Sequence, residues 1–136
     1  MTQKDKQLLL KCLCARLPYK VYVNYDSGKD KQYEGILNDI LPSLGEAYVE
    51  YCLCDIDNIR PYLRPMSSMT KDEIREFDEF CVIDEYAWRG GSMQGFINQA
   101  EIMQNGIDWL NAHHFDYRGL IEKGLALEAP EGMYEI

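Results

Sequence analysis

The hydrophobic pattern changes its period at Pro18, and this change constrains the fold more than any other feature of the chain. Residues 3–16 carry apolar side chains at helical spacing after a polar start, which predicts an amphipathic helix that Pro18 ends. Residues 19–25 then alternate, with the odd positions on one face, and residues 26–29 supply turn chemistry. The chain therefore begins with a helix whose apolar stripe needs a surface to cover, followed by a strand that enters a hairpin.

Residues 33–41 and 46–54 are predicted to form two more strands, separated by a turn at 42–45. Together with the first strand they make a small antiparallel meander. Residues 55–59 fit a polar or helical turn, and residues 60–65 must run extended because each proline disfavours helix in the residue before it. This last segment is either an ordered loop or an edge strand. The order of these elements is similar to that of small SH3-like barrels, a likeness of fold that assigns no function.

Two further helices are predicted in the second half of the chain. Thr70 and Glu73 have the spacing of a capping box, which starts a helix over about 70–81. A longer helix is predicted over about 92–113, where apolar residues step by four and three, and we expect it to cross the sheet. The stepping residues are Phe96, Ala100, Met103, Ile107 and Leu110.

The predicted fold class is α+β, with an N-terminal helix, a small antiparallel sheet or SH3-like partial barrel over about 19–64, and two further helices. A chain of 136 residues has the usual size of one domain, so residues 1–136 are predicted to form a single domain. At this length a stable core needs neither a metal ion nor a disulfide. We therefore expect no cofactor.

Four stretches carry a resemblance to other proteins. They are Leu8–Lys11, Leu13–Pro18, Pro61–Thr70 and Trp109–Pro130. These stretches resemble a group of small uncharacterised proteins encoded by gut-bacterial phages and mobile elements. The resemblance implies a phage or prophage origin and an accessory role, and it names no reaction.

The charge of the chain is strongly acidic and unevenly distributed. The formal net charge is -9, yet residues 1–34 hold seven Lys or Arg against four Asp or Glu. A negative field repels phosphate backbones and anionic lipid, so we expect no direct nucleic-acid binding and no membrane binding. The expected partner is a basic host or phage protein, unless the charge serves solubility alone. No apolar run approaches the ~20 residues of a membrane span, and we expect a soluble protein in the bacterial cytoplasm.

Five cysteines form an odd set that suits a reducing cytosol better than a disulfide framework. Cys12 and Cys14 lie about 200° apart on a helix, so they do not converge on one ion. Cys52 and Cys54 share one face of a strand and can contribute to a metal site, although cysteine is also a small core residue. No metal site is predicted.

Two imidazoles, a carboxylate and a guanidinium occur within six residues, His113, His114, Phe115, Asp116, Tyr117 and Arg118. Such a set can bind an anion or metal, or move protons. However, adjacent helical residues point about 100° apart, whereas metal pairs need a spacing of three or four. Three interpretations stay open here: a cap on the end of the helix, a protein-binding patch, and a catalytic or metal site.

The segment Arg60–Met66 offers two arginines, a tyrosine and a stiff backbone, which are typical of an interface anchor. The alternative is structural. Arg60 and Arg64 can pair with neighbouring acids, while Tyr62 and Leu63 close the barrel.

Residues 72–85 contain seven carboxylates against a single arginine. A solvated helix face explains them, and mimicry of a phosphate backbone that inhibits a host nucleic-acid-binding protein is the sharper alternative. The seven acids are Asp72, Glu73, Glu76, Asp78, Glu79, Asp84 and Glu85.

The sequence thus favours a non-enzymatic phage or prophage accessory protein that acts by protein binding. Two alternatives remain, a small enzyme or metal protein that uses His113, His114 and Asp116, and the acidic DNA mimic. No catalytic residue is assigned. The candidate binding residues are Arg60, Tyr62, Arg64, Met66, His113, His114, Asp116, Tyr117 and Arg118.

Overall fold

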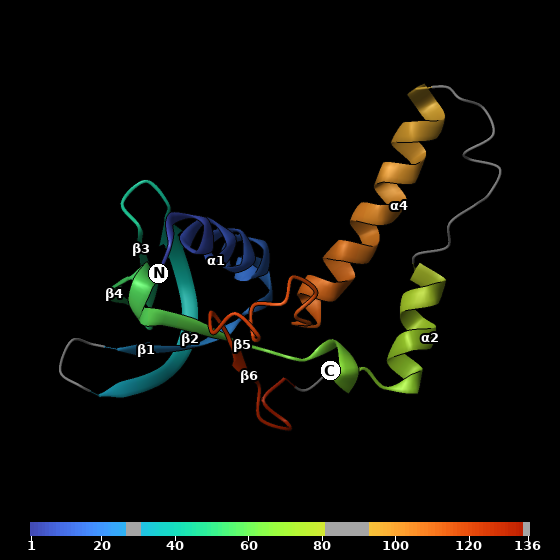
Figure 1. Cartoon of the computed structure of the whole chain (residues 1–136). Coiled ribbons are helices and arrows are strands. Elements are labelled where there is room, and N and C mark those ends of the chain that lie inside the picture. Colours follow the sequence, from blue (N-terminus) through green and yellow to red (C-terminus); the bar gives the residue numbers. More distant parts are fainter. Residues whose placement is uncertain (27–30, 81–92, 135–136) are drawn as a thin grey trace.

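The protein consists of a curved sheet covered by one helix, from which a pair of helices projects (Figure 1). The structure is a computed structural model that describes residues 1–26, 31–80 and 93–134. Asp84, Glu85 and Cys81 lie outside the described residues.

The first helix, α1 (Gln3–Arg16), has the predicted bounds. It begins where the Thr2 hydroxyl accepts a hydrogen bond of 3.1 Å from the Asp5 N–H, a side-chain cap that satisfies an otherwise free donor. A 3-10 turn, η1 (Leu17–Tyr19), follows it with Pro18 inside. Leu9, Cys12 and Leu13 are fully buried against the sheet, so the apolar stripe finds the surface that it needs.

Six strands form one sheet in the order β4-β3-β2-β1-β5-β6. All neighbours pair antiparallel except β5 and β6, which are parallel. The α+β class and the antiparallel sheet are therefore confirmed, and a 3-10 turn, η2 (Ile56–Asn58), precedes β5 as expected. The strands are β1 (Tyr22–Asp26), β2 (Gln32–Leu41), β3 (Glu46–Val49), β4 (Cys52–Asp55), β5 (Ile59–Leu63) and β6 (Leu127–Glu128).

The single strand predicted over 46–54 is wrong, because β3 and β4 are two strands of a tight hairpin. Glu50 and Tyr51 both adopt positive φ at its turn, although neither is a glycine or asparagine. Hydrogen bonds between side chains and main-chain N–H groups join this strained turn to β2 and stabilise it. The Glu50 carboxylate accepts the Ile36 N–H at 2.8 Å, and the Asn38 side-chain oxygen accepts the Tyr51 N–H at 2.9 Å.

Residues 60–65 form neither a loop nor an edge strand. β5 pairs with β1 on one side and with β6 on the other. The predicted limit of the sheet at about residue 64 is also wrong, since β6 comes from the C-terminal segment. This pairing could not be predicted from the sequence, because its two strands are far apart along the chain. In addition, a strand of two residues shows no hydrophobic periodicity.

The helices α2 (Lys71–Phe80) and α4 (Met93–Ala112) fall close to their predicted bounds. The expectation that α4 crosses the sheet is wrong. It packs on α2 and extends away from the sheet, which α1 already covers (Figure 1). Only its C-terminal end joins a second apolar cluster, through Trp109 and Leu110. Among the described residues, no helix is long and apolar enough to cross a membrane.

The side chain of Tyr134 links β1 to β5. The link lies next to the last residue pair that the two strands form. Its hydroxyl accepts the Tyr22 N–H at 3.0 Å and donates to the Tyr62 carbonyl oxygen at 2.7 Å. Burial raises the pKa of this phenol, so the hydroxyl keeps its proton for donation. The C-terminal segment is thereby fastened to the sheet.

We predict that Tyr134→Phe lowers the free energy of unfolding by about 1–3 kcal/mol, since a partly buried N–H loses its acceptor. Urea denaturation followed by tryptophan fluorescence measures the change. Tyr51→Phe is the matched control because Tyr51 is 86% exposed. Equal stabilities of the two variants would contradict a bridging role for the hydroxyl.

Candidate functional site

The segment that follows α4 lies between α1 and β5 and is held from both sides. The Arg64 N–H donates to the His114 carbonyl oxygen at 2.8 Å, and the Asp116 N–H donates to the Arg64 carbonyl oxygen at 2.9 Å. From the other side, the guanidinium of Arg16 donates to the Phe115 carbonyl oxygen. The structure therefore brings parts of three separated stretches, around residues 16, 64 and 115, into direct contact.

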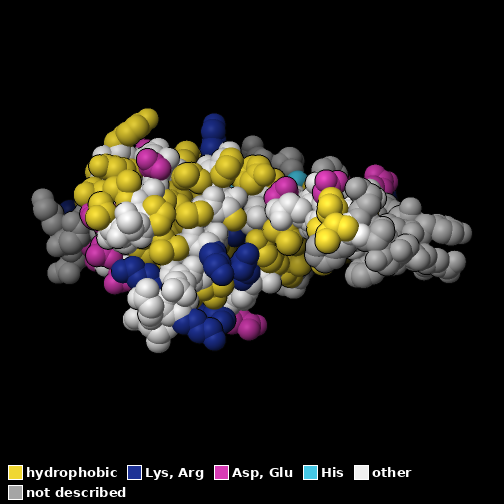
Figure 2. Space-filling view, turned by 90° about the horizontal axis from the view of Figure 1, so that it is seen from above, with side chains coloured by type: hydrophobic (Ala, Val, Ile, Leu, Met, Phe, Trp, Pro, Cys, Tyr) yellow, Lys and Arg dark blue, Asp and Glu magenta, His cyan; other side chains and the backbone are white. Residues whose placement is uncertain are grey.

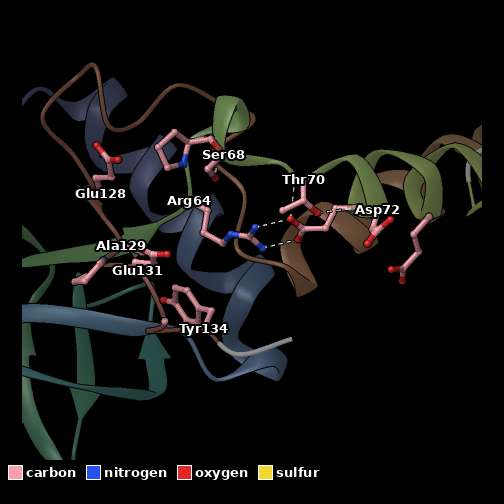
Figure 3. A pocket seen from close by; sticks show the side chains of 13 residues that line it. Arg64, Ser68, Thr70, Asp72, Glu128, Ala129, Glu131 and Tyr134 are labelled. Carbon is pink, nitrogen blue, oxygen red and sulfur yellow. Dashed lines mark hydrogen bonds and ion pairs between the residues drawn. The ribbon is translucent and has the colours of Figure 1, made fainter.

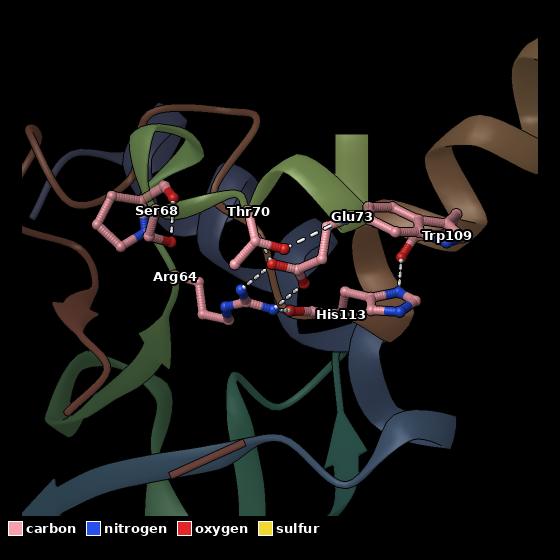
Figure 4. Close-up of polar contacts among 7 residues, drawn as sticks. Arg64, Ser68, Thr70, Glu73, Trp109 and His113 are labelled. Carbon is pink, nitrogen blue, oxygen red and sulfur yellow. Dashed lines mark hydrogen bonds and ion pairs between the residues drawn. The ribbon is translucent and has the colours of Figure 1, made fainter. Parts of the chain in front are cut away.

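The two histidines lie at the C-terminal end of α4, where they contribute to its cap. His114 has φ 61°, its N–H donates to the Asn111 carbonyl oxygen, and the Phe115 N–H donates to the Leu110 carbonyl oxygen. This is the Schellman arrangement, with a histidine where glycine is usual. The His113 Nδ1 lies 2.9 Å from the Trp109 carbonyl oxygen (Figure 4).

Each imidazole is held against a different aromatic ring. His113 stacks on Trp109 with ring centroids 3.9 Å apart, and His114 stacks on Tyr134 at 3.8 Å. His114 is almost completely buried. Burial, together with the nearby Arg16 charge, lowers the pKa of His114 to about 4, so its ring is neutral at pH 7.

Asp116 completes the turn after the helix. Its carboxylate accepts the Leu120 N–H at 2.8 Å and the Ile121 N–H at 3.0 Å. Both carboxylate oxygens are therefore engaged in local structure. Within the described part of the chain, no three His, Cys, Asp or Glu side chains are grouped to hold a metal ion.

Arg64 also joins the sheet to the projecting helices. Its guanidinium donates to both carboxylate oxygens of Glu73, at 2.8 Å and 2.7 Å (Figure 4), and lies over the Phe115 ring with Cζ 4.1 Å from the centroid. Glu73 accepts the Thr70 N–H as well, while the Thr70 hydroxyl accepts the Glu73 N–H, as in a capping box. The Arg64 hydrogen bonds lower the pKa of Glu73 to about 2.

A cleft of about 690 Å³ opens beside this ion pair. One wall is the start of α2 and the turn before it, and the facing wall is the C-terminal segment, with Arg64 between them (Figure 3). The walls carry five carboxylates and one guanidinium. The carboxylates belong to Asp72, Glu73, Glu76, Glu128 and Glu131.

Among the described residues that line the cleft, the single cation is already neutralised. Arg64 is ion-paired with Glu73, and both side chains are more than four-fifths buried. Asp72 has only a 3.8 Å contact with the exposed Arg75, and Glu76 accepts the Trp109 indole N–H at 3.3 Å. Glu128 and Glu131 make no ion pair with any described residue. The cleft is therefore a site of net negative charge.

The remaining predicted binding residues do not share this cleft. Arg60 donates to the carbonyl oxygens of Asp57, Ile59 and Gly124, and the Tyr62 hydroxyl donates to Glu34 at 2.9 Å. Arg60 therefore pairs with no acid in the described part of the chain, whereas Arg64 pairs with Glu73. Met66 is exposed in the 3-10 turn η3 (Met66–Ser68).

Tyr117 and Arg118 lie on the other side of the capped turn. The Tyr117 hydroxyl donates to the Asn111 side chain at 3.1 Å, and the Arg118 guanidinium lies 5.3 Å from the Tyr117 ring centroid. Arg118 also lines a groove of about 440 Å³ against the basic face of α1, with Lys4, Lys11 and Lys123. Lys and Arg side chains gather together on the face seen in Figure 2.

Glu128, Glu131 and Tyr134 were not predicted as site residues. The C-terminal segment contains Pro130 and Gly132, which predicted an irregular tail. The sequence showed that the segment carries two acidic residues, but not where they lie in the fold. Nothing local indicated that this segment returns to face α2.

The C-x-C cysteines divide between the core and the surface. Cys12 and Cys54 are buried, while Cys14 and Cys52 are exposed. The Cys12 sulfur accepts a hydrogen bond of 3.0 Å from Arg16, and burial nonetheless raises the pKa of this thiol.

Comparison with protein-family models, curated proteins and solved structures finds no significant match to this chain. The resemblance to phage-encoded proteins therefore stays a prediction.

We predict that Glu73→Gln lowers the free energy of unfolding at pH 7 by about 2 kcal/mol, because a buried guanidinium loses its charged partner while the cap acceptor is kept. The loss should shrink as pH falls from about 4.5 to 2, since Glu73 in the wild type then becomes protonated. Urea denaturation at several pH values measures it. Glu79→Gln, an exposed change in the same helix, is the control, and an equal effect there would contradict the ion-pair account.

His114 should make folding stability pH-dependent between pH 4 and 6.5. In this window the unfolded chain holds the proton and the folded chain does not, so stability falls as pH is lowered, by up to about 1.4 kcal/mol per pH unit. His114→Asn, which tolerates positive φ, should remove this component. His113→Asn should retain it, and a loss of the slope in the His113 variant instead would contradict the assignment.

Proposed function

We propose that the protein acts by non-enzymatic protein binding, and that the acidic cleft receives a basic segment of its partner. The observation that carries the proposal is the charge of the cleft. Of its described lining residues, the one cation, Arg64, is ion-paired with Glu73, and four further carboxylates remain. The partner in this proposal is a host or phage protein with an exposed Lys- or Arg-rich segment.

The electrostatics favour a cation over any other ligand. Carboxylates crowded on facing walls repel one another, and a guanidinium or ammonium between them relieves that repulsion. The field of a chain with net charge -9 also draws basic segments toward it and speeds encounter. An anionic ligand would meet the opposite field at the same cleft.

The shape of the cleft suits a long basic side chain. Pro65, Ala129 and Pro130 provide apolar wall between the carboxylates. Lys and Arg pack their methylene stems on such surface while the charged group stays at a polar site. The volume of about 690 Å³ is in the range of ordinary ligand pockets.

The acidic surface continues beyond the cleft along α2. Glu79 is exposed and lies on the same face of the helix as Asp72 and Glu76, whereas Asp78 points about 200° away from Glu76. A basic segment of several residues can therefore extend from the cleft along the helix. This arrangement gives a role to Asp72, Glu76 and Glu79 without requiring a nucleic-acid-like geometry.

The proposal is tested with a fluorescent peptide of alternating Arg and Ser, and its binding is measured by anisotropy at low ionic strength. We expect Glu128→Gln/Glu131→Gln to weaken binding about tenfold, as two partly exposed charge contacts of about 0.7 kcal/mol each would. A peptide of alternating Glu and Ser should not bind.

The matched control is Glu101→Gln/Glu122→Gln, which removes two exposed carboxylates outside the cleft. It lowers the net negative charge by the same amount, so it measures the effect of overall charge alone. Equal weakening in both double variants, or no binding by the wild type, would contradict a binding role for the cleft.

A further inference from the structure

A second hollow in the surface lies between α1 and the turn that follows α4, and basic side chains surround it. It is the groove of about 440 Å³ that Arg118 lines. Its described lining residues carry four cations against one carboxylate, on a chain whose net charge is -9. None of them also lines the acidic cleft. They are Lys4, Asp5, Gln7, Leu8, Lys11, Arg118 and Lys123.

One wall of the groove is a face of α1. Lys4, Leu8 and Lys11 are spaced by four and three residues, so they lie on the same side of the helix. Both lysines are exposed. Asp5 points about 100° away from Lys4 and therefore borders this face of the helix.

The facing wall is the turn over residues 118–124, whose main chain is fixed by buried contacts. The Asp116 carboxylate accepts the N–H groups of Leu120 and Ile121. Leu120 is also buried in the apolar core to which α1 contributes. Arg118 and Lys123 are exposed on either side of these two anchored residues. Both walls of the groove therefore belong to the folded core, and only the charged ends of the side chains extend into solvent.

The cations of the groove are not neutralised by the protein. In the part of the chain that the structure describes, none of the four makes an ion pair. Glu122 is exposed beside Lys123 in the sequence, but it does not line the groove. Like charges on facing walls repel one another, and an anion between them relieves this repulsion. The groove is thus a local site of positive charge on an acidic protein.

We propose that this groove binds a small ligand through an oligophosphate group. Such a group carries several negative charges within a few atoms, and both lysine and arginine side chains recognise phosphate oxygens. The volume of about 440 Å³ is in the range of small-molecule sites.

The net charge of the chain favours a small anion over a large one. A ligand held inside the groove stays within about 8 Å, one Debye length, of the four cations. A nucleic acid or an acidic protein extends beyond the groove, where it meets the negative field of a chain with net charge -9. The oligophosphate site is independent of the binding role proposed for the acidic cleft.

Isothermal titration calorimetry of the whole protein with inorganic triphosphate, at low ionic strength, tests the proposal. Lys11→Gln/Lys123→Gln removes one cation from each wall and should weaken binding about tenfold. Lys4→Gln/Arg118→Gln removes the other two cations and should weaken binding by a similar factor. Inorganic phosphate carries fewer charges and should bind more weakly than triphosphate.

Titration with ATP distinguishes two sources of the phosphates. Tighter binding of ATP than of triphosphate would identify a nucleotide as the ligand. Binding of ATP that is no tighter would identify a free oligophosphate. Either result supports the groove as the site, provided that the groove variants weaken it.

The matched control is Lys31→Gln/Lys71→Gln, which removes two exposed lysines outside the groove. It changes the net charge as Lys11→Gln/Lys123→Gln does, yet it should bind triphosphate almost as tightly as the wild type. Equal weakening in the control, or no binding of triphosphate and ATP by the wild type, would overturn the proposal. So would tighter binding of the alternating Glu and Ser peptide, which would assign the groove to an acidic protein instead.

Discussion

The arrangement of the structure depends on the interactions that Arg64 makes. Its main chain pairs with the segment that leaves α4, at His114 and Asp116, while its guanidinium holds Glu73 at the start of α2. One residue thus fixes both ends of the projecting helical pair to the sheet. The same ion pair neutralises the one positive charge among the described residues of the cleft wall, so a structural contact also leaves the cleft with net negative charge.

The polar side chains of the turn after α4 serve the local structure. His114 and Asp116 satisfy nearby main-chain groups or pack on an aromatic ring, and His113 caps the end of its own helix. Neutral, buried His114 is a poor general base at pH 7 because its pKa lies well below that value. These side chains stabilise the turn that pairs with the Arg64 main chain, and the cleft beside Arg64 is lined by carboxylates.

Local patterns predicted α1, α2 and α4 within a few residues, because periodicity and capping depend on neighbours in sequence. The hairpin at Glu50 and Tyr51 was missed because it depends on hydrogen bonds to a distant strand, from the Ile36 N–H to the Glu50 carboxylate and from the Tyr51 N–H to the Asn38 side chain. Strand β6 and the carboxylates of Glu128 and Glu131 were missed for a related reason. Their positions depend on a chain return that spans more than sixty residues from β5, which no local pattern encodes.

The proposed binding of a basic segment can be located most directly by nuclear magnetic resonance. Titration of the alternating Arg and Ser peptide into ¹⁵N-labelled protein should shift amide signals of Arg64, of Thr70–Glu76 and of Glu128–Gly132, which surround the cleft. The signals of the exposed carboxylates on the sheet should move little. Shifts spread evenly over all acidic surfaces, or confined to the sheet, would contradict the cleft as the binding site.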